Sequence, residues 1–193
     1  MVRHGLPVRI DEADGPADPE LSDEGRTQAV RLADWLRGDA IDAVYVSPMR
    51  RAVQTAEPLA DAFGLEAVVD DELAEFDRDA HFYVPIEELK AAGDERYQKI
   101  MRGEFDGEVD PQQFREVVAV AVERIIEAHP GNTVAIVCHG GVINAWASHV
   151  LGLPDPIFFE PFYTSVNRFL ASSRGHRTLA SLNDLGHLRG TRG

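Results

Sequence analysis

The stretch TVAIVCHGGVINAWASHVLG, residues 133–152, decides the fold of this 193-residue chain. Its first half is an unbroken apolar run of the kind found in strands that are buried on both faces, as in parallel sheets. Its second half, from Gly140, continues directly as a helix. A buried strand followed by a helix is the repeating unit of α/β folds. His139 stands at the junction, where such folds carry their working residues.

The same alternation extends along the chain in both directions. Further strands are expected at the N-terminus and at residues 43–47, 66–70, 164–172 and 177–184. Further helices are expected from the N-cap Ser22 to about Arg37, over residues 50–63, and along the apolar stripe of residues 114–126. We therefore predict an α/β three-layer sandwich, with a mostly parallel central sheet and helices on both faces. Residues 1–193 are expected to form one domain, with a small helical cap insert at about 76–112.

Composition excludes several classes of partner. The chain has 19 basic and 33 acidic residues, a net charge of −14, which argues against a nucleic-acid or membrane partner because both need a basic face. The lone Cys138 excludes an internal disulfide and favours a reducing compartment. There is no apolar run long enough for a membrane span and no signal-peptide stretch. We expect a cytoplasmic protein.

Three predicted strand ends carry charged and imidazole side chains. The first is followed by Arg3 and His4, the second by Arg50 and Arg51, and the third by His139. Because carboxyl ends of parallel strands meet at one edge, these residues are expected on one rim. Glu75, in the loop after residues 66–70, is a fourth contributor.

This set of side chains suits phosphoryl transfer through a phosphohistidine. A neutral imidazole serves as nucleophile near pH 7, and planar guanidinium groups hold the phosphoryl oxygens. A second imidazole, if protonated, adds charge to the same oxygens. A carboxylic acid protonates the leaving alkoxide and then activates water. The scheme needs neither metal nor cofactor, and its partner is a small phosphorylated substrate.

Four motifs in order strengthen this interpretation. They are RHG at residues 3–5, SPMRRAVQTA at 47–56, L-x-E at 73–75 and CHGG at 138–141. Together they resemble the histidine phosphatase superfamily, which includes cofactor-dependent phosphoglycerate mutases and many phosphomonoesterases. The resemblance covers essentially the whole chain.

The resemblance implies a role for each residue. His4 would be the phosphorylated nucleophile and Arg3 a phosphate clamp. The second clamp is the arginine directly before alanine, which is Arg51 and not Arg50. His139 corresponds to the second histidine of the phosphate pocket, and Glu75 to the proton donor. A metal-independent phosphatase of a small phosphomonoester is therefore the predicted function.

The glycines beside these histidines fit the same scheme. Gly5 and Gly140 let the backbone approach a phosphate closely. Gly140 and Gly141 would also open a helix whose first amides face the anion.

Several alternatives stay open at this stage. A phosphomutase is one, although LPVRID at 6–11 departs from the segment that follows RHG in the glycolytic mutases. A phosphate-binding module without catalysis is another. Glu72 and Asp77 rival Glu75 as the acid, whereas Cys138 reads as a core residue. Phe158, Phe159 and Tyr163 read as a core edge or an interface, so a homodimer is left open.

The first predicted strand is unusually short. Only Met1 and Val2 precede Arg3, whereas strands usually have five or six residues. The sequence leaves open whether the natural chain begins upstream of Met1.

Overall fold

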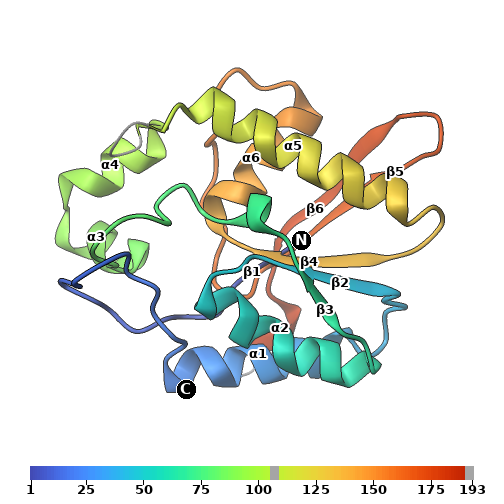
Figure 1. The fold of residues 1–193 in the computed structure, drawn as a ribbon, viewed down its shortest axis with the longest axis horizontal. Helices are drawn as coiled ribbons and strands as arrows, with labels where there is room; N and C mark the ends of the chain where they lie inside the picture. Colours follow the sequence, from blue (N-terminus) through green and yellow to red (C-terminus); the bar gives the residue numbers. More distant parts are fainter. Residues whose placement is uncertain (105–108, 190–193) are drawn as a thin grey trace.

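A six-stranded sheet runs through the middle of the computed structural model, which describes residues 1–104 and 109–189 (Figure 1). In chain order the strands are β1 (Val2–Arg3), β2 (Ala43–Val46), β3 (Ala67–Val69), β4 (Val134–Cys138), β5 (Val166–Ala171) and β6 (Arg177–Asp184). Their order across the sheet is β3-β2-β4-β1-β5-β6. The first four pair in parallel, and β5 runs antiparallel to both β1 and β6. The sheet is therefore mixed but mostly parallel, as predicted.

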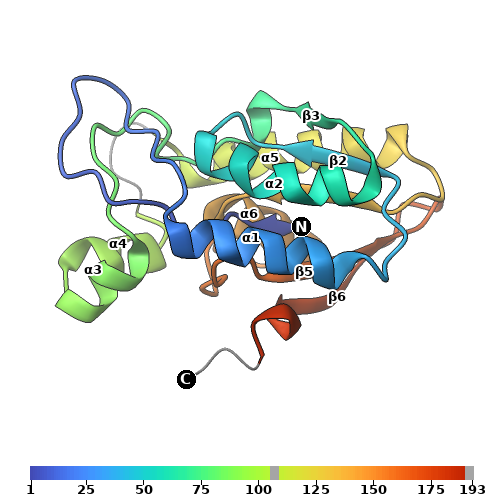
Figure 2. The same ribbon diagram turned by 90° about the horizontal axis from the view of Figure 1, so that it is seen from below.

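Helices cover both faces of this sheet. Helices α1 (Asp23–Leu36) and α2 (Arg50–Phe63) lie below it in Figure 1, and α5 (Pro111–Ala128) and α6 (Gly140–Leu151) lie above. Figure 2 shows α1 and α2 packed side by side on their face. The three-layer α/β prediction is confirmed.

The position of β4 inside the sheet explains why its sequence is apolar throughout. Ala135 and Val137 point into the core between the sheet and helices α1 and α2. Ile136 and Cys138 point into the core between the sheet and helices α5 and α6. Successive side chains of a strand alternate between the two faces, so a central strand between two helical layers needs apolar residues at every position. Cys138 is fully buried, as expected of a core residue.

Capping fixes where the helices begin. The Ser22 hydroxyl accepts a hydrogen bond from the Gly25 amide at 3.1 Å, as its predicted N-cap role requires. Helix α5 begins before the apolar stripe because the Asp110 carboxylate accepts from the Gln112 and Gln113 amides and Pro111 fits the first turn. Helix α2 has no cap of its own; Asp18 instead accepts from the Arg50 amide at 2.9 Å.

The predicted cap insert contains two short helices. They are α3 (Ile86–Ala92) and α4 (Glu95–Met101), which stand apart from the helical layers on the left of Figure 1. Positions 105–108 of the insert lie outside the described residues. Within the described ranges, no helix is both long and apolar enough to cross a membrane.

Backbone packing anchors the loop that follows β1. A Cβ atom on Gly5 would lie 2.7 Å from the Gly25 carbonyl oxygen, and a Cβ on Gly25 would overlap the Leu6 carbonyl oxygen. The first turn of α1 therefore rests directly on the backbone next to His4.

Gly25→Ala is expected to lower the free energy of unfolding by about 1–3 kcal/mol, because main-chain atoms cannot yield to the added methyl group. Gly38→Ala is the matched control, since a Cβ there meets nothing within 4 Å. Urea titrations of the two variants compare them. Equal stability of the two would contradict the close packing at Gly25.

Candidate active site

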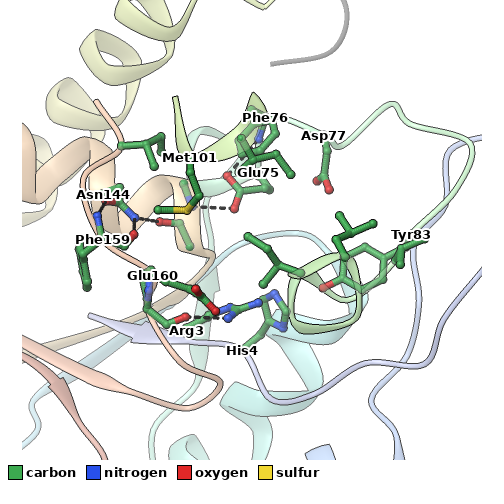
Figure 3. A pocket seen from close by; sticks show the side chains of 18 of the residues that line it. Arg3, His4, Glu75, Phe76, Asp77, Tyr83, Met101, Asn144, Phe159 and Glu160 are labelled. Carbon is green, nitrogen blue, oxygen red and sulfur yellow. Dashed lines mark hydrogen bonds between the residues drawn. The ribbon is translucent and has the colours of Figure 1, made fainter. Parts of the chain in front are cut away.

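A pocket opens at the end of the sheet where β1 and β4 finish, under the cap (Figure 3). The lining comes from separate parts of the chain. Arg3 and His4 follow β1, Arg51 belongs to the first turn of α2, Glu75 follows β3, and Gly140 opens α6. Of the side chains that the sequence predicted on one rim, Arg3, His4, Arg51 and Glu75 line this pocket. His139 is fully buried next to His4 and Arg50 is exposed, and neither is part of the lining.

His4 is held as a neutral imidazole whose Nε2 is unprotonated. Its Nδ1 lies 2.8 Å from the Gly5 carbonyl oxygen, which can only accept, so Nδ1 carries the proton. Burial, followed by the charges of Arg51 and Arg3, lowers the pKa of His4 well below its usual value. The Nε2 atom is therefore unprotonated at neutral pH, as a nucleophile must be.

Arg51 lies next to that nitrogen. Its Nε donates a hydrogen bond to His4 Nε2 at 3.3 Å, and its side chain is 1 % exposed. One further nitrogen, Nη2, is 3.5 Å from Asp77, and Nη1 has no partner among the described residues. A buried guanidinium with an unmatched donor is ready to bind an anion. Arg50, by contrast, is exposed and pairs with Glu20.

Arg3 is the second buried cation of the pocket. Its Nη1 donates to the Pro161 carbonyl at 2.6 Å and to Glu87 at 3.2 Å. The guanidinium lies 3.8 Å from the centre of the Tyr163 ring, which fixes its plane. Its Nε has no partner within the described parts of the chain.

His139 completes the imidazole pair. Its ring centre is 5.0 Å from that of His4, and Nε2 is 2.7 Å from the Ser47 hydroxyl. The Ser47 hydroxyl also accepts from the Met49 amide at 3.3 Å, so it joins His139 to the backbone of the segment after β2. Nδ1 has no partner in the described structure, and in the tautomer in which Ser47 donates to Nε2 it carries the ring proton and can donate to an anion.

His139 is neutral in the structure, whereas the sequence left a protonated imidazole open. Burial and then the neighbouring Arg51 lower the pKa of His139 well below its usual value. In the free protein His139 is a neutral hydrogen-bond donor. The positive charge of the pocket comes from the two arginines.

Glu75 is the buried carboxyl group of the pocket. Oε2 accepts from the Gly141 amide at 2.8 Å and Oε1 from the Phe76 amide at 3.2 Å. Burial, followed by the nearby Asp77, raises the pKa of Glu75 to about 7. The group is therefore poised to give and take a proton near neutral pH.

The two other candidates for the acid, Glu72 and Asp77, each lie beside an arginine. Glu72 pairs with Arg124 at 2.8 Å, and Asp77 faces Arg51. Among the three, Glu75 alone is buried.

The two glycines at the start of α6 have different roles. Gly140 lines the pocket beside Arg3, whose Nε is 3.9 Å from where a Cβ would stand. The Gly141 amide donates to Glu75, so it orients the carboxyl group rather than facing an anion. A Cβ on Gly141 would overlap Glu75 Oε1, so this close contact requires glycine.

Sequence reasoning missed several residues of the site. Tyr163 lies on Arg3 and 5.7 Å from the His4 ring, and Phe159 lines the pocket, so neither is merely a core edge. Thr55 accepts from the Gly5 amide at 2.9 Å and donates to the Arg51 carbonyl at 2.7 Å, which ties the two neighbouring loops together. Ser47 and Thr55 belong to the SPMRRAVQTA motif, whose spacing was the available signal.

No three His, Cys, Asp or Glu side chains in the described ranges are grouped so that they could hold a metal ion.

Two imidazoles, two buried arginines and a carboxyl group at the end of a mostly parallel sheet define the class of site found in histidine-dependent phosphoryl-transfer proteins. The chain belongs to branch 1 of the histidine phosphatase superfamily, whose family model matches residues 1–185.

Individual relatives include phosphatases and mutases. Phosphoserine phosphatase 1 of Hydrogenobacter thermophilus is 29% identical over 143 residues, 72% of this chain and 68% of that protein. A probable phosphoglycerate mutase GpmB of Yersinia enterocolitica is 29% identical over 160 residues, 80% of this chain and 74% of its own.

Solved structures share the fold. Phosphoserine phosphatase from Entamoeba histolytica, in complex with 3-phosphoglyceric acid, superposes with a TM-score of 0.76 at 25% identity. The match covers 97% of this chain and 96% of that chain.

Proposed function

We propose that the protein is a phosphatase that hydrolyses a small phosphomonoester through a phosphohistidine on His4, without a metal ion or cofactor. The observation that carries the proposal is the unprotonated His4 Nε2, which accepts a hydrogen bond from Arg51 Nε at 3.3 Å in a buried pocket and so lies beside the guanidinium that would hold the phosphoryl group. Arg3, Arg51 and the His139 Nδ1–H supply donors for the phosphoryl oxygens. The small phosphorylated ligand of the Entamoeba relative supports a substrate of that kind.

In the first step His4 Nε2 attacks phosphorus and the bond to the alcohol oxygen breaks. Glu75, which is protonated below pH 7 because its pKa is raised to about 7, gives its proton to the departing oxygen. In the second step the Glu75 carboxylate takes a proton from water, the oxygen of that water attacks phosphorus, and the P–N bond breaks. His4 returns to its starting form, with the proton still on Nδ1 beside the Gly5 carbonyl.

The charges of the phosphoryl group are balanced within the pocket. Arg3 and Arg51 are both at least 95% buried, where their attraction for an anion is less screened than in water. Their carboxylate neighbours Glu87 and Asp77 leave part of each guanidinium unmatched. These contacts support phosphate binding by the protein alone.

The products decide between hydrolysis and transfer. With p-nitrophenyl phosphate and a chelator present, we expect p-nitrophenol and inorganic phosphate in equal amounts. Added glycerate or sugar acceptors are expected to leave this ratio unchanged. A mutase would instead move phosphate onto an acceptor and release little of it, and a binding module without catalysis would release neither product.

A further inference from the structure

The part of the pocket that receives the alcohol has an apolar wall. It is built from the segment after β3, from the cap and from the loop after α6. The side chains that make it are Phe76, Ile86, Leu89, Ile100, Met101 and Phe159. Figure 3 shows Met101 and Phe76 beside Glu75, with Phe159 on the opposite side near Asn144.

Positive charge is confined to the phosphate end. Among the described lining residues, Arg3 and Arg51 are the only lysine or arginine side chains, and both are committed to the phosphoryl group and to acidic neighbours. The remaining charged lining residues are acidic, namely Glu75, Asp77 and Glu160.

Glu160 shows how the rim of the pocket is arranged. Its carboxylate accepts from Lys90 at 2.7 Å and from the Tyr97 hydroxyl at 3.1 Å. Lys90 is half exposed and lies outside the pocket lining, so its charge is engaged at the rim. Among the described lining residues, a carboxylate carried by the alcohol would find no cation beyond the two that hold the phosphoryl group. It would meet apolar side chains or acidic oxygens, at a desolvation cost.

We propose that the substrate is the phosphate ester of an uncharged, apolar alcohol, aryl or alkyl, and that the pocket discriminates against alcohols bearing a carboxylate. Phosphoserine and 3-phosphoglycerate both bear one, so this chain is assigned a different substrate class from the relatives named after them. This assignment rests on the proposed phosphatase function.

A matched pair of esters tests the assignment. Phenyl phosphate and 4-carboxyphenyl phosphate share the ring and differ by one carboxylate, and the carboxylate makes the second the more reactive ester in water. We expect kcat/KM to be at least about 30-fold higher for phenyl phosphate. Phosphoserine and 3-phosphoglycerate are expected to be poorer still.

A charge placed in the wall should reverse part of this preference. Met101→Lys is expected to raise kcat/KM for 4-carboxyphenyl phosphate relative to phenyl phosphate by about 10-fold. Gln98→Lys adds the same charge to the exposed side of α4 and should leave the ratio unchanged. Equal changes in the two variants would overturn the role of the wall.

The failure of this inference is distinguishable from that of the phosphatase proposal. If p-nitrophenyl phosphate is hydrolysed but carboxylated esters are preferred, the substrate class is wrong and the phosphatase stands. If nothing is hydrolysed, calorimetry with phenylphosphonate and 4-carboxyphenylphosphonate still measures the preference. Tighter binding of the carboxylated phosphonate would overturn the assignment, and tighter binding of phenylphosphonate would support it.

Discussion

Replacement of His4 by alanine is expected to reduce turnover of p-nitrophenyl phosphate by about 10⁴-fold or more, because the nucleophile of a covalent mechanism has no substitute. Nothing else in the described pocket offers an unprotonated lone pair in the same place. His139, 5.0 Å away between ring centres, has its Nε2 engaged by Ser47 and lies outside the pocket lining. Phosphate binding should persist, since Arg3 and Arg51 remain.

The same variant tests the covalent intermediate directly. Wild type mixed rapidly with substrate and quenched in alkali is expected to show the added mass of one phosphoryl group on the peptide that contains His4. His4→Ala should show none. His176→Ala is the control, because His176 is exposed in the turn between β5 and β6 and should retain full activity. A phosphorylated peptide elsewhere in the chain would refute the assignment of His4.

Much of the fold and of the site could be predicted, because the hydrophobic pattern of the sequence matches the burial of each strand in the fold. The run Val134–Cys138 is apolar at every position since β4 lies between two helical layers, and that made the strand visible in the sequence. The motifs then placed polar residues at the ends of neighbouring strands. Parallel pairing of β4 with β1 and β2 brought those ends together.

The supporting residues could not be predicted in the same way. Tyr163 acts through its ring against Arg3, a contact between residues 160 positions apart in the chain. Nothing local marks such a residue, so its aromatic character fitted a core edge equally well. The choice among Glu72, Glu75 and Asp77 likewise depended on burial and on the Gly141 amide, which only the fold supplies.

The protonation states also belong to the folded protein. An imidazole has its usual pKa near neutrality, about 6.5, so the sequence left a protonated His139 open. In the fold, burial beside Arg51 makes its neutral form the stable one. Glu75, whose pKa is raised to about 7, is thereby the group that exchanges a proton near neutral pH, while both imidazoles are neutral.

That separation of roles makes the pH profile diagnostic. The pKa of Glu75 is raised to about 7, so the proton donor is present below pH 7 and is lost as the pH rises above it. For an alkyl phosphate, whose alkoxide leaves only with a proton, kcat/KM of the wild type should be level in mildly acidic solution and fall about tenfold per pH unit above pH 7. Glu75→Gln cannot titrate and should give a level profile across that range.

Glu75→Gln should also separate esters by their leaving groups. The rate of the first step is expected to fall by roughly 10²–10⁴-fold for an alkyl phosphate and far less for p-nitrophenyl phosphate, whose anion is stable without a proton. The second step has lost its base with either ester. Rapid mixing of the variant with p-nitrophenyl phosphate should therefore give a burst of p-nitrophenol followed by slow turnover, and the alkyl ester should give no burst.

The matched control is Glu72→Gln, whose carboxylate lies in the same segment but pairs with Arg124 outside the pocket lining. It should behave as wild type with both esters. Equal slowing of the first step for good and poor leaving groups in Glu75→Gln would show that the side chain only orients the pocket. A burst confined to p-nitrophenyl phosphate would instead require a proton donor at position 75, because only proton donation distinguishes the two esters in that step.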